Sequence, residues 1–206
     1  MDNHSKVLTG RAGVVTLLIL VFITKADALT ICSYGRSFNY ALPEEEHGKG
    51  KMDDAVIFVP VAGRLLDIDL AIDIRHSSVC DLQIYLVSPA GTRVCLNYYD
   101  VYDFQPNQVN YEWTIFNDDA LVPIESAQAP FSASFRPKGT ARLSVFNGEN
   151  PYGSWRIQVY DIAYADSGIF RSARLDMVIN PEPATVLIFC TGLFFLRAAR
   201  PGRLKG

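Results

Sequence analysis

The stretch LDIDLAIDI, residues 66–74, alternates strictly between apolar and other side chains. Successive side chains of an extended strand point to opposite faces, so one face carries the large apolar residues Leu66, Ile68, Leu70, Ile72 and Ile74. The opposite face carries three aspartates. This pattern predicts a β-strand with one face in a hydrophobic core and the other in water.

Similar short apolar runs follow through the middle of the chain, separated by turn-forming residues. No window of 11 or more residues there has the 3.6-residue apolar period of an amphipathic helix, so we expect helices of one or two turns at most. The chain is therefore predicted to form an all-β antiparallel sandwich or jelly roll. The expected strands are Ala55–Val61, Leu65–Ile74, Leu82–Val87, Arg93–Leu96, Trp113–Phe116, Arg142–Phe146, Trp155–Ile162 and Ser172–Ile179.

The charge is unevenly distributed along the 206 residues. The net charge of −3 combines about +1 in residues 1–28, −8 in residues 29–183 and +4 in residues 184–206. An acidic body with scattered basic residues repels a phosphate backbone, so no nucleic-acid partner is expected.

The N-terminal segment has the features of a secretory signal peptide. Lys6 and Arg11 precede an apolar run at 12–23, and Ala26 and Ala28 form a small-residue cleavage site. We expect a signal helix within residues 1–28 that directs export.

The C-terminal segment, residues 181–206, combines Pro181, Glu182 and Pro183 with an apolar run at 184–196 and the basic residues Arg197 and Arg200. This order predicts a transmembrane helix with a cytoplasmic basic end, which leaves the body outside the inner membrane. It resembles the PEP-CTERM sorting tail of Gram-negative bacteria. That resemblance implies processing by an exosortase and delivery to the cell surface, whereas a plain membrane anchor is the alternative.

Four blocks in residues 52–180 resemble the P domain (P/Homo B) of subtilisin-like proprotein convertases. They are IDIRH at 72–76 with DLQIYLVSPAGT at 81–92, FNDDA at 116–120, LSVFNG at 143–148, and GSWRIQVYD at 153–161 with DSG at 166–168. The resemblance implies a jelly-roll accessory module, preceded here by an extension at 29–51. Cys80 departs from the pattern, because the family usually has glycine at that position.

The body lacks the signature of an enzyme. No Gly-x-Ser-x-Gly or similar nucleophile motif accompanies His76, and about 120 residues of sandwich leave no room for a protease domain. We interpret His76 as a packing and capping residue. The resemblance to the P domain implies an association with serine-type endopeptidases and proteolysis without catalysis by this chain.

Aspartates at strand ends and turns offer hard oxygen ligands that suit calcium outside the cell. The candidates are Asp81, Asp118, Asp119, Asp161 and Asp166. Aspartate is also a preferred turn former, so a purely structural role is the alternative. The tyrosine-rich segment 98–104 has two interpretations, an exposed aromatic platform for sugar or protein and a strand edge with partly buried rings.

The cysteines allow one geometric test. If the hairpin at Ser88–Thr92 keeps its apolar residues in the core, Cys95 pairs with Tyr85 and lies roughly 17 Å from Cys80, too far for a disulfide. A bridge, if one forms after export, should then involve Cys32.

Two functions follow. The first is a non-catalytic module of the cell surface or matrix that binds an extracellular polysaccharide or a surface protein. The second is an accessory P domain that supports a subtilisin-like protease encoded elsewhere.

Overall fold

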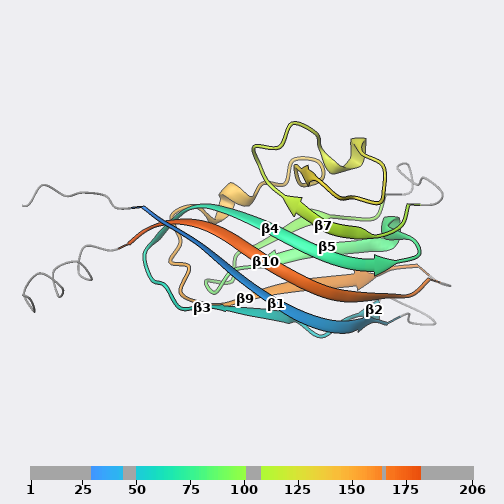
Figure 1. Ribbon diagram of the computed structural model, residues 1–206, viewed down its shortest axis with the longest axis horizontal. Coiled ribbons are helices and arrows are strands. Elements are labelled where there is room, and N and C mark those ends of the chain that lie inside the picture. Colours follow the sequence, from blue (N-terminus) through green and yellow to red (C-terminus); the bar gives the residue numbers. More distant parts are fainter. Residues whose placement is uncertain (1–28, 44–49, 101–107, 164–165, 182–206) are drawn as a thin grey trace, which may run out of the picture.

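The computed structural model describes residues 29–43, 50–100, 108–163 and 166–181. They form two facing β-sheets of five strands each (Figure 1). Within each sheet most neighbouring strands are antiparallel, and β7 and β8 are parallel. Sheet A has the order β1-β10-β4-β7-β8, and sheet B has the order β2-β9-β5-β6 with β3 also paired to β9. The strands of sheet A are β1 (Thr30–Leu42), β4 (Arg64–His76), β7 (Tyr111–Phe116), β8 (Ser134–Phe135) and β10 (Gly168–Asn180). Those of sheet B are β2 (Gly50–Lys51), β3 (Ala55–Val59), β5 (Leu82–Val87), β6 (Arg93–Asn97) and β9 (Gly153–Asp161).

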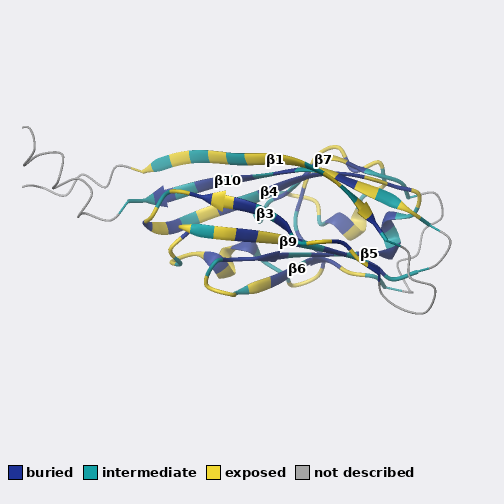
Figure 2. Cartoon of the chain, turned by 90° about the horizontal axis from the view of Figure 1, so that it is seen from below, coloured by how far each residue is buried: buried dark blue, intermediate teal, exposed yellow. Residues whose placement is uncertain are grey.

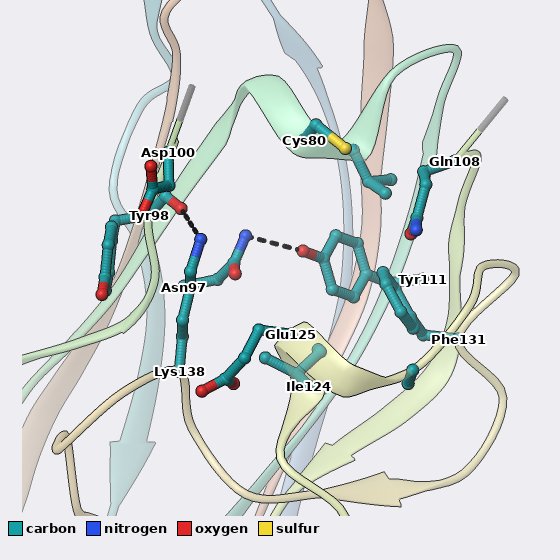
Figure 3. Close-up of a pocket in the computed structure, with 12 residues that line it drawn as sticks. Cys80, Asn97, Tyr98, Asp100, Gln108, Tyr111, Ile124, Glu125, Phe131 and Lys138 are labelled. Atoms are coloured by element: carbon teal, nitrogen blue, oxygen red, sulfur yellow. Dashed lines mark hydrogen bonds between the residues drawn. The ribbon is translucent and has the colours of Figure 1, made fainter. Parts of the chain in front are cut away.

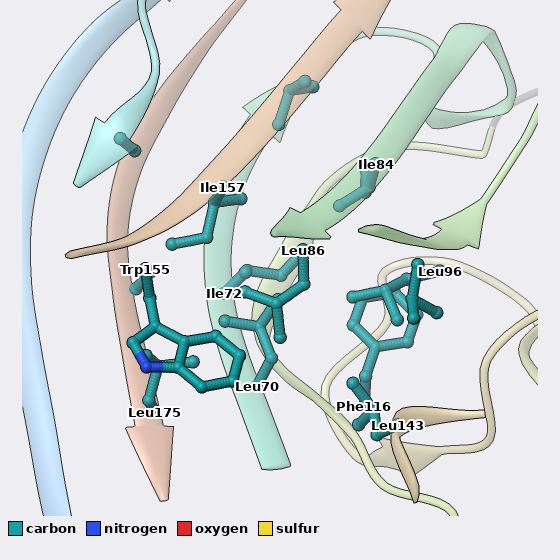
Figure 4. Close-up of a cluster of buried hydrophobic side chains, with 14 of the residues drawn as sticks. Leu70, Ile72, Ile84, Leu86, Leu96, Phe116, Leu143, Trp155, Ile157 and Leu175 are labelled. Carbon is teal, nitrogen blue, oxygen red and sulfur yellow. The ribbon is translucent and has the colours of Figure 1, made fainter. Parts of the chain in front are cut away.

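The core lies between the sheets and takes side chains from both. Leu70, Ile72 and Leu175 of sheet A face Ile84, Leu86, Trp155 and Ile157 of sheet B, all 0 % exposed (Figure 4). Buried and more exposed residues alternate along much of the strands, as Figure 2 shows, but β4 is buried on both faces from Leu70 to Ile74. The predicted all-β sandwich is confirmed.

One predicted strand is wrong. Residues 143–146 form the 3₁₀ helix η3 (Leu143–Phe146) instead of a strand. The carboxylate of Asp118 accepts the backbone N–H groups of Leu143 at 2.9 Å and Ser144 at 2.8 Å. Leu143 and Phe146 are three residues apart, so they share one face of a three-residue turn and both enter the core. The other short helices are η1 (Val79–Asp81) and η2 (Ile124–Ser126).

The first residue of the predicted alternation is also corrected. In the pairing with β10, Asp67 lies opposite Val178 but Leu65 lies opposite Ile179, so β4 has an extra residue there. This bulge turns Leu65, and not Leu66, into the core. From Ile68 to Ile74 the predicted core face is as expected.

β1 was missed by the sequence analysis. It is a 13-residue edge strand that pairs with β10 along most of its length. Its sequence carries Gly35, Arg36 and Ser37 in place of an apolar run. Small and charged residues of this kind are common in edge strands, where they discourage pairing with another chain.

The hairpin of β5 and β6 has the predicted register, because Tyr85 lies opposite Cys95. Ser88 and Gly91 close the turn through a 3.0 Å backbone hydrogen bond, and Gly91 has the expected positive φ of 94°. Within the described residues, Cys32, Cys80 and Cys95 form no disulfide bond. Cys80 lies within η1 without a positive φ, so a side chain fits where the family usually has glycine.

The predicted signal peptide and all of the predicted sorting tail except Pro181 lie outside the described residues, including Ala26, Ala28, Glu182, Pro183, Arg197 and Arg200. Within the part that is described, no helix is long and apolar enough to cross a membrane.

Candidate functional site

A buried polar cluster joins the two sheets where β4 and β9 end. The Nε2 atom of His76, on sheet A, lies 3.0 Å from Oδ2 of Asp161, on sheet B. Both side chains are fully buried. The other ring nitrogen, Nδ1, lies 2.7 Å from the carbonyl oxygen of Ser78 and 3.1 Å from its backbone nitrogen. Both nitrogens of the imidazole are therefore engaged by the fold.

Two more of the predicted aspartates lie around this pair. Asp81 is buried, and its burial raises the pKa of the carboxyl group above the ordinary value. The charges of Asp166 and Asp161 act in the same direction, while a hydrogen bond from Ser78 and the charge of His76 oppose it. Asp166 itself accepts a 2.6 Å hydrogen bond from the Ser77 hydroxyl.

Gly168 closes the cluster from β10. A Cβ atom at this position would lie 2.4 Å from the carbonyl oxygen of Arg75 and 2.4 Å from Cδ2 of His76. Only glycine allows the strand to approach the imidazole this closely. The DSG block at 166–168 thus has a packing role.

The contacts of His76 are those of a structural residue. A hydrolase needs a nucleophile within hydrogen-bond reach of its base, and here the imidazole contacts a carboxylate and the Ser78 main chain. The arrangement agrees with the packing and capping role that the sequence predicted for His76.

The remaining two aspartates lie elsewhere. Asp118 caps η3, and the backbone N–H of Asp119 donates to the side chain of Asn117, which itself donates to Asp69 of β4 at 2.8 Å. Asp69 and His76 are seven residues apart on one strand, roughly 23 Å at 3.3 Å per residue. The fold therefore separates Asp118 and Asp119 from Asp81, Asp161 and Asp166. Across the described ranges, no three histidine, cysteine, aspartate or glutamate side chains are grouped so that they could hold a metal ion. Calcium binding stays a prediction of the sequence.

A small crevice opens at the end of the sandwich between η1, η2 and the end of β6 (Figure 3). Asn97 donates to the hydroxyl of Tyr111 at 3.0 Å, and Nζ of the buried Lys138 donates to the carbonyl oxygen of Tyr98 at 3.0 Å. Burial raises the pKa of Tyr111, so its hydroxyl stays protonated. The crevice holds about 50 Å³. That is room for one or two waters, well below the roughly 300 Å³ at which ligand pockets begin.

Sequence reasoning also missed a depression on the outer face of sheet A that is lined by Asp73, Arg75, Glu112, Trp113 and Arg171. These residues come from three strands, and nothing in any one strand's pattern marks them as neighbours. A tryptophan beside a glutamate in a strand expected to alternate was the available signal.

Two solved structures resemble part of this chain. The serine protease of Aeromonas sobria in complex with its chaperone ORF2 is 18 % identical, with a TM-score of 0.46 over 75 % of this chain and 28 % of that chain. The structure of the Aeromonas sobria serine protease gives 18 % identity and a TM-score of 0.45 over 74 % of this chain and 27 % of that chain. This chain thus spans little more than a quarter of either match. No curated protein matches it.

Residues 65–177, more than half of the chain, match the model of the proprotein convertase P-domain. This range contains the alternating strand, the His76–Asp161 cluster and η3. The chain therefore belongs to the P-domain family, an accessory domain of subtilisin-like proteases that is not itself catalytic.

Proposed function

We propose that this chain is a non-catalytic module that acts outside the cell by binding an extracellular polysaccharide or a surface protein. The observation that carries the proposal is that both ring nitrogens of His76 contact groups of the fold itself, Asp161 and the main chain of Ser78. His76 is the single histidine among the described residues, and its ring links the two sheets instead of facing a nucleophile. Because this imidazole is part of the packing, we infer that the described sandwich acts by binding and not by catalysis.

Export is part of the proposal. The signal segment 1–28 and the tail 181–206 support a path through the inner membrane, followed by exosortase cleavage near Pro181 and release to the cell surface. Mass spectrometry of the surface-associated protein should find a C-terminus close to this position. A C-terminus that still includes Arg200 would contradict processing and favour a permanent membrane anchor.

A second function, support of a subtilisin-like serine protease encoded elsewhere, is favoured by the family itself. An accessory domain stabilises a partner through contact, and this requires no catalytic group of its own. Co-production with a subtilase tests it, because the thermal stability of that enzyme should rise when the two proteins are together.

The central claim is tested by assaying the purified body, residues 29–180, against peptide substrates. We expect no cleavage, and His76→Ala should alter stability alone. Peptide-bond cleavage by the body that His76→Ala abolishes would overturn the proposal.

A further inference from the structure

Two irregularities meet at one position of sheet A. On one side of Asp73, β7 places both Glu112 and Trp113 between residues that pair with Ile72 and Ile74. On the other side, β10 has the extra residue Arg171 between Phe170 and Ser172. Such bulges reorient side chains and are frequent beside functional sites. Here they bring side chains of three strands to the same outward face.

The bulge in β7 holds Trp113 in an unusual conformation. Its φ is 51°, in the left-handed region that glycine normally occupies in bulges and that bulky residues rarely adopt. The result is that Trp113 is 50 % exposed, while Tyr111 and Thr114 on either side of the bulge are buried. Backbone strain of this kind is often found at functional sites.

The surroundings of Trp113 form a shallow polar depression of about 290 Å³. Asp73 is 7 % exposed and forms its floor, with Oδ2 3.3 Å from Nη1 of Arg171. Arg75 and Glu112 complete the lining. Two arginines and two carboxylates give the site no net formal charge, and the volume is at the small end of ligand pockets.

We propose that this depression binds a neutral saccharide, with Trp113 as the stacking platform. The flat face of a sugar ring is lined by C–H groups that pack on an aromatic ring, and its hydroxyls both donate and accept hydrogen bonds. Glu112 accepts such bonds and Arg75 and Arg171 donate them. The inference rests on the proposed function, since it names the ligand of the binding module.

The charge balance and the shape favour this ligand over others. A site for an acidic polymer needs a surplus of positive charge. Here the carboxylates of Asp73 and Glu112 balance the two arginines. A stable protein interface needs about 1,000 Å² with an apolar centre, and a single tryptophan among charged groups does not supply that centre. A small polyhydroxylated ligand matches both the size and the mixed donors and acceptors.

Affinity electrophoresis of the purified body tests the proposal with hydroxyethyl cellulose, dextran and galactomannan as neutral polymers and alginate as the acidic one. At least one neutral polymer should retard the protein more than alginate does. The chain has two tryptophans, and Trp155 is fully buried, so the same polymer should change the emission of Trp113. Trp113→Gly, which fits the positive φ, should weaken binding roughly tenfold or more, as truncation of an aromatic anchor does.

Arg171→Gln should weaken binding as well and provides a second variant with a small change in volume. Tyr152→Ala is the matched control, because Tyr152 is equally exposed at 53 % but precedes β9 of sheet B. It should bind like the wild type. Failure of every neutral polymer to bind, or a preference for alginate, would overturn the ligand class. Unchanged binding by Trp113→Gly and Arg171→Gln would overturn the site but would leave the proposed function standing. The proposed function is tested separately, by the peptide-cleavage assay of the body.

Discussion

The core and the outer face of sheet A each contain a tryptophan in a β-strand, Trp155 and Trp113. The first is buried and the second is half exposed. Trp155 lies in a strand of regular alternation and is 0 % exposed. Its Nε1 donates to the carbonyl oxygen of Pro151 at 2.9 Å, and its ring packs on Phe146 at a centroid distance of 5.2 Å. Trp113 lies at a bulge and is half exposed at a positive φ.

We infer from this difference that Trp155 stabilises the fold, whereas Trp113 is held in place by the fold. A left-handed conformation costs a non-glycine residue about 1–2 kcal/mol. The large core between the sheets offsets that cost, so the outer face can hold Trp113 at a positive φ. The comparison predicts that substitutions in the core reduce stability and that substitutions at the depression reduce binding.

The largest expected effect is that of Trp155→Ala. Removal of the indole leaves a cavity between the sheets and an unpaired Pro151 carbonyl group, so the free energy of unfolding should fall by about 3–5 kcal/mol. Urea denaturation followed by circular dichroism measures the loss. A loss below about 1 kcal/mol would show that the core is not organised around this ring.

Next in size is the polar link at the end of the core. Asp161→Ala leaves the buried imidazole of His76 without its partner at Nε2 and should cost about 2–3 kcal/mol. Asp161→Asn keeps the size and one hydrogen bond, so it should cost less. Equal losses in the two variants, measured by the same denaturation, would mean that the link to His76 contributes little.

These two regions also mark how far the sequence predicts the structure. Ile68, Leu70, Ile72 and Ile74 were assigned to the core from alternation alone, because burial on one face of a strand imposes a period of two. Leu66 was assigned to the wrong face and residues 142–146 to a strand. The bulge beside Leu66 depends on pairing with Val178 and Ile179, and η3 depends on a carboxylate 25 residues earlier in the chain.

The candidate site shows the same limit. The aspartates were recognised as polar groups at strand ends, but only the register of β4 separates Asp118 and Asp119 from Asp161. Trp113, Arg171 and Asp73 become neighbours through two bulges in different strand pairs, and a bulge leaves no reliable mark in one sequence. Local alternation therefore predicts the core well and the outer surface poorly.

On the outer face of sheet A, a smaller and pH-dependent effect is expected from Asp69. Burial raises the pKa of Asp69 to about 6, helped by the charge of Asp67 and opposed by the hydrogen bond from Asn117. The unfolded chain has the ordinary value of 3.8, so the folded state binds more protons between about pH 4 and 6. Stability contributed by this group is therefore lost as the pH rises through that window.

Asp69→Asn removes the unfavourable charge and keeps an acceptor for Asn117. It should stabilise the protein at pH 7 by about 1 kcal/mol, a value reduced because the group is only half buried, and by almost nothing at pH 4. Denaturation curves at both pH values measure the difference. Asp53→Asn, at an exposed aspartate, controls for the loss of one surface charge, and an equal gain at both pH values in Asp69→Asn would refute the assignment.

The smallest expected change in stability is that of Trp113→Gly, the counterpart of the first variant. Glycine relieves the strain at φ 51°, but it loses the buried half of the indole surface and makes the unfolded chain more flexible. The relief of strain, about 1–2 kcal/mol, opposes the two losses, which are each about 1 kcal/mol, so the free energy of unfolding should fall by no more than about 1 kcal/mol. Trp113→Ala is the informative companion, because alanine loses the ring and keeps the strain, and it should therefore be less stable than the glycine variant. If Trp113→Gly lowered the free energy of unfolding by 2 kcal/mol or more relative to the wild type, about the scale of a buried side chain, the ring would be a part of the packing and the two tryptophans would differ only in degree.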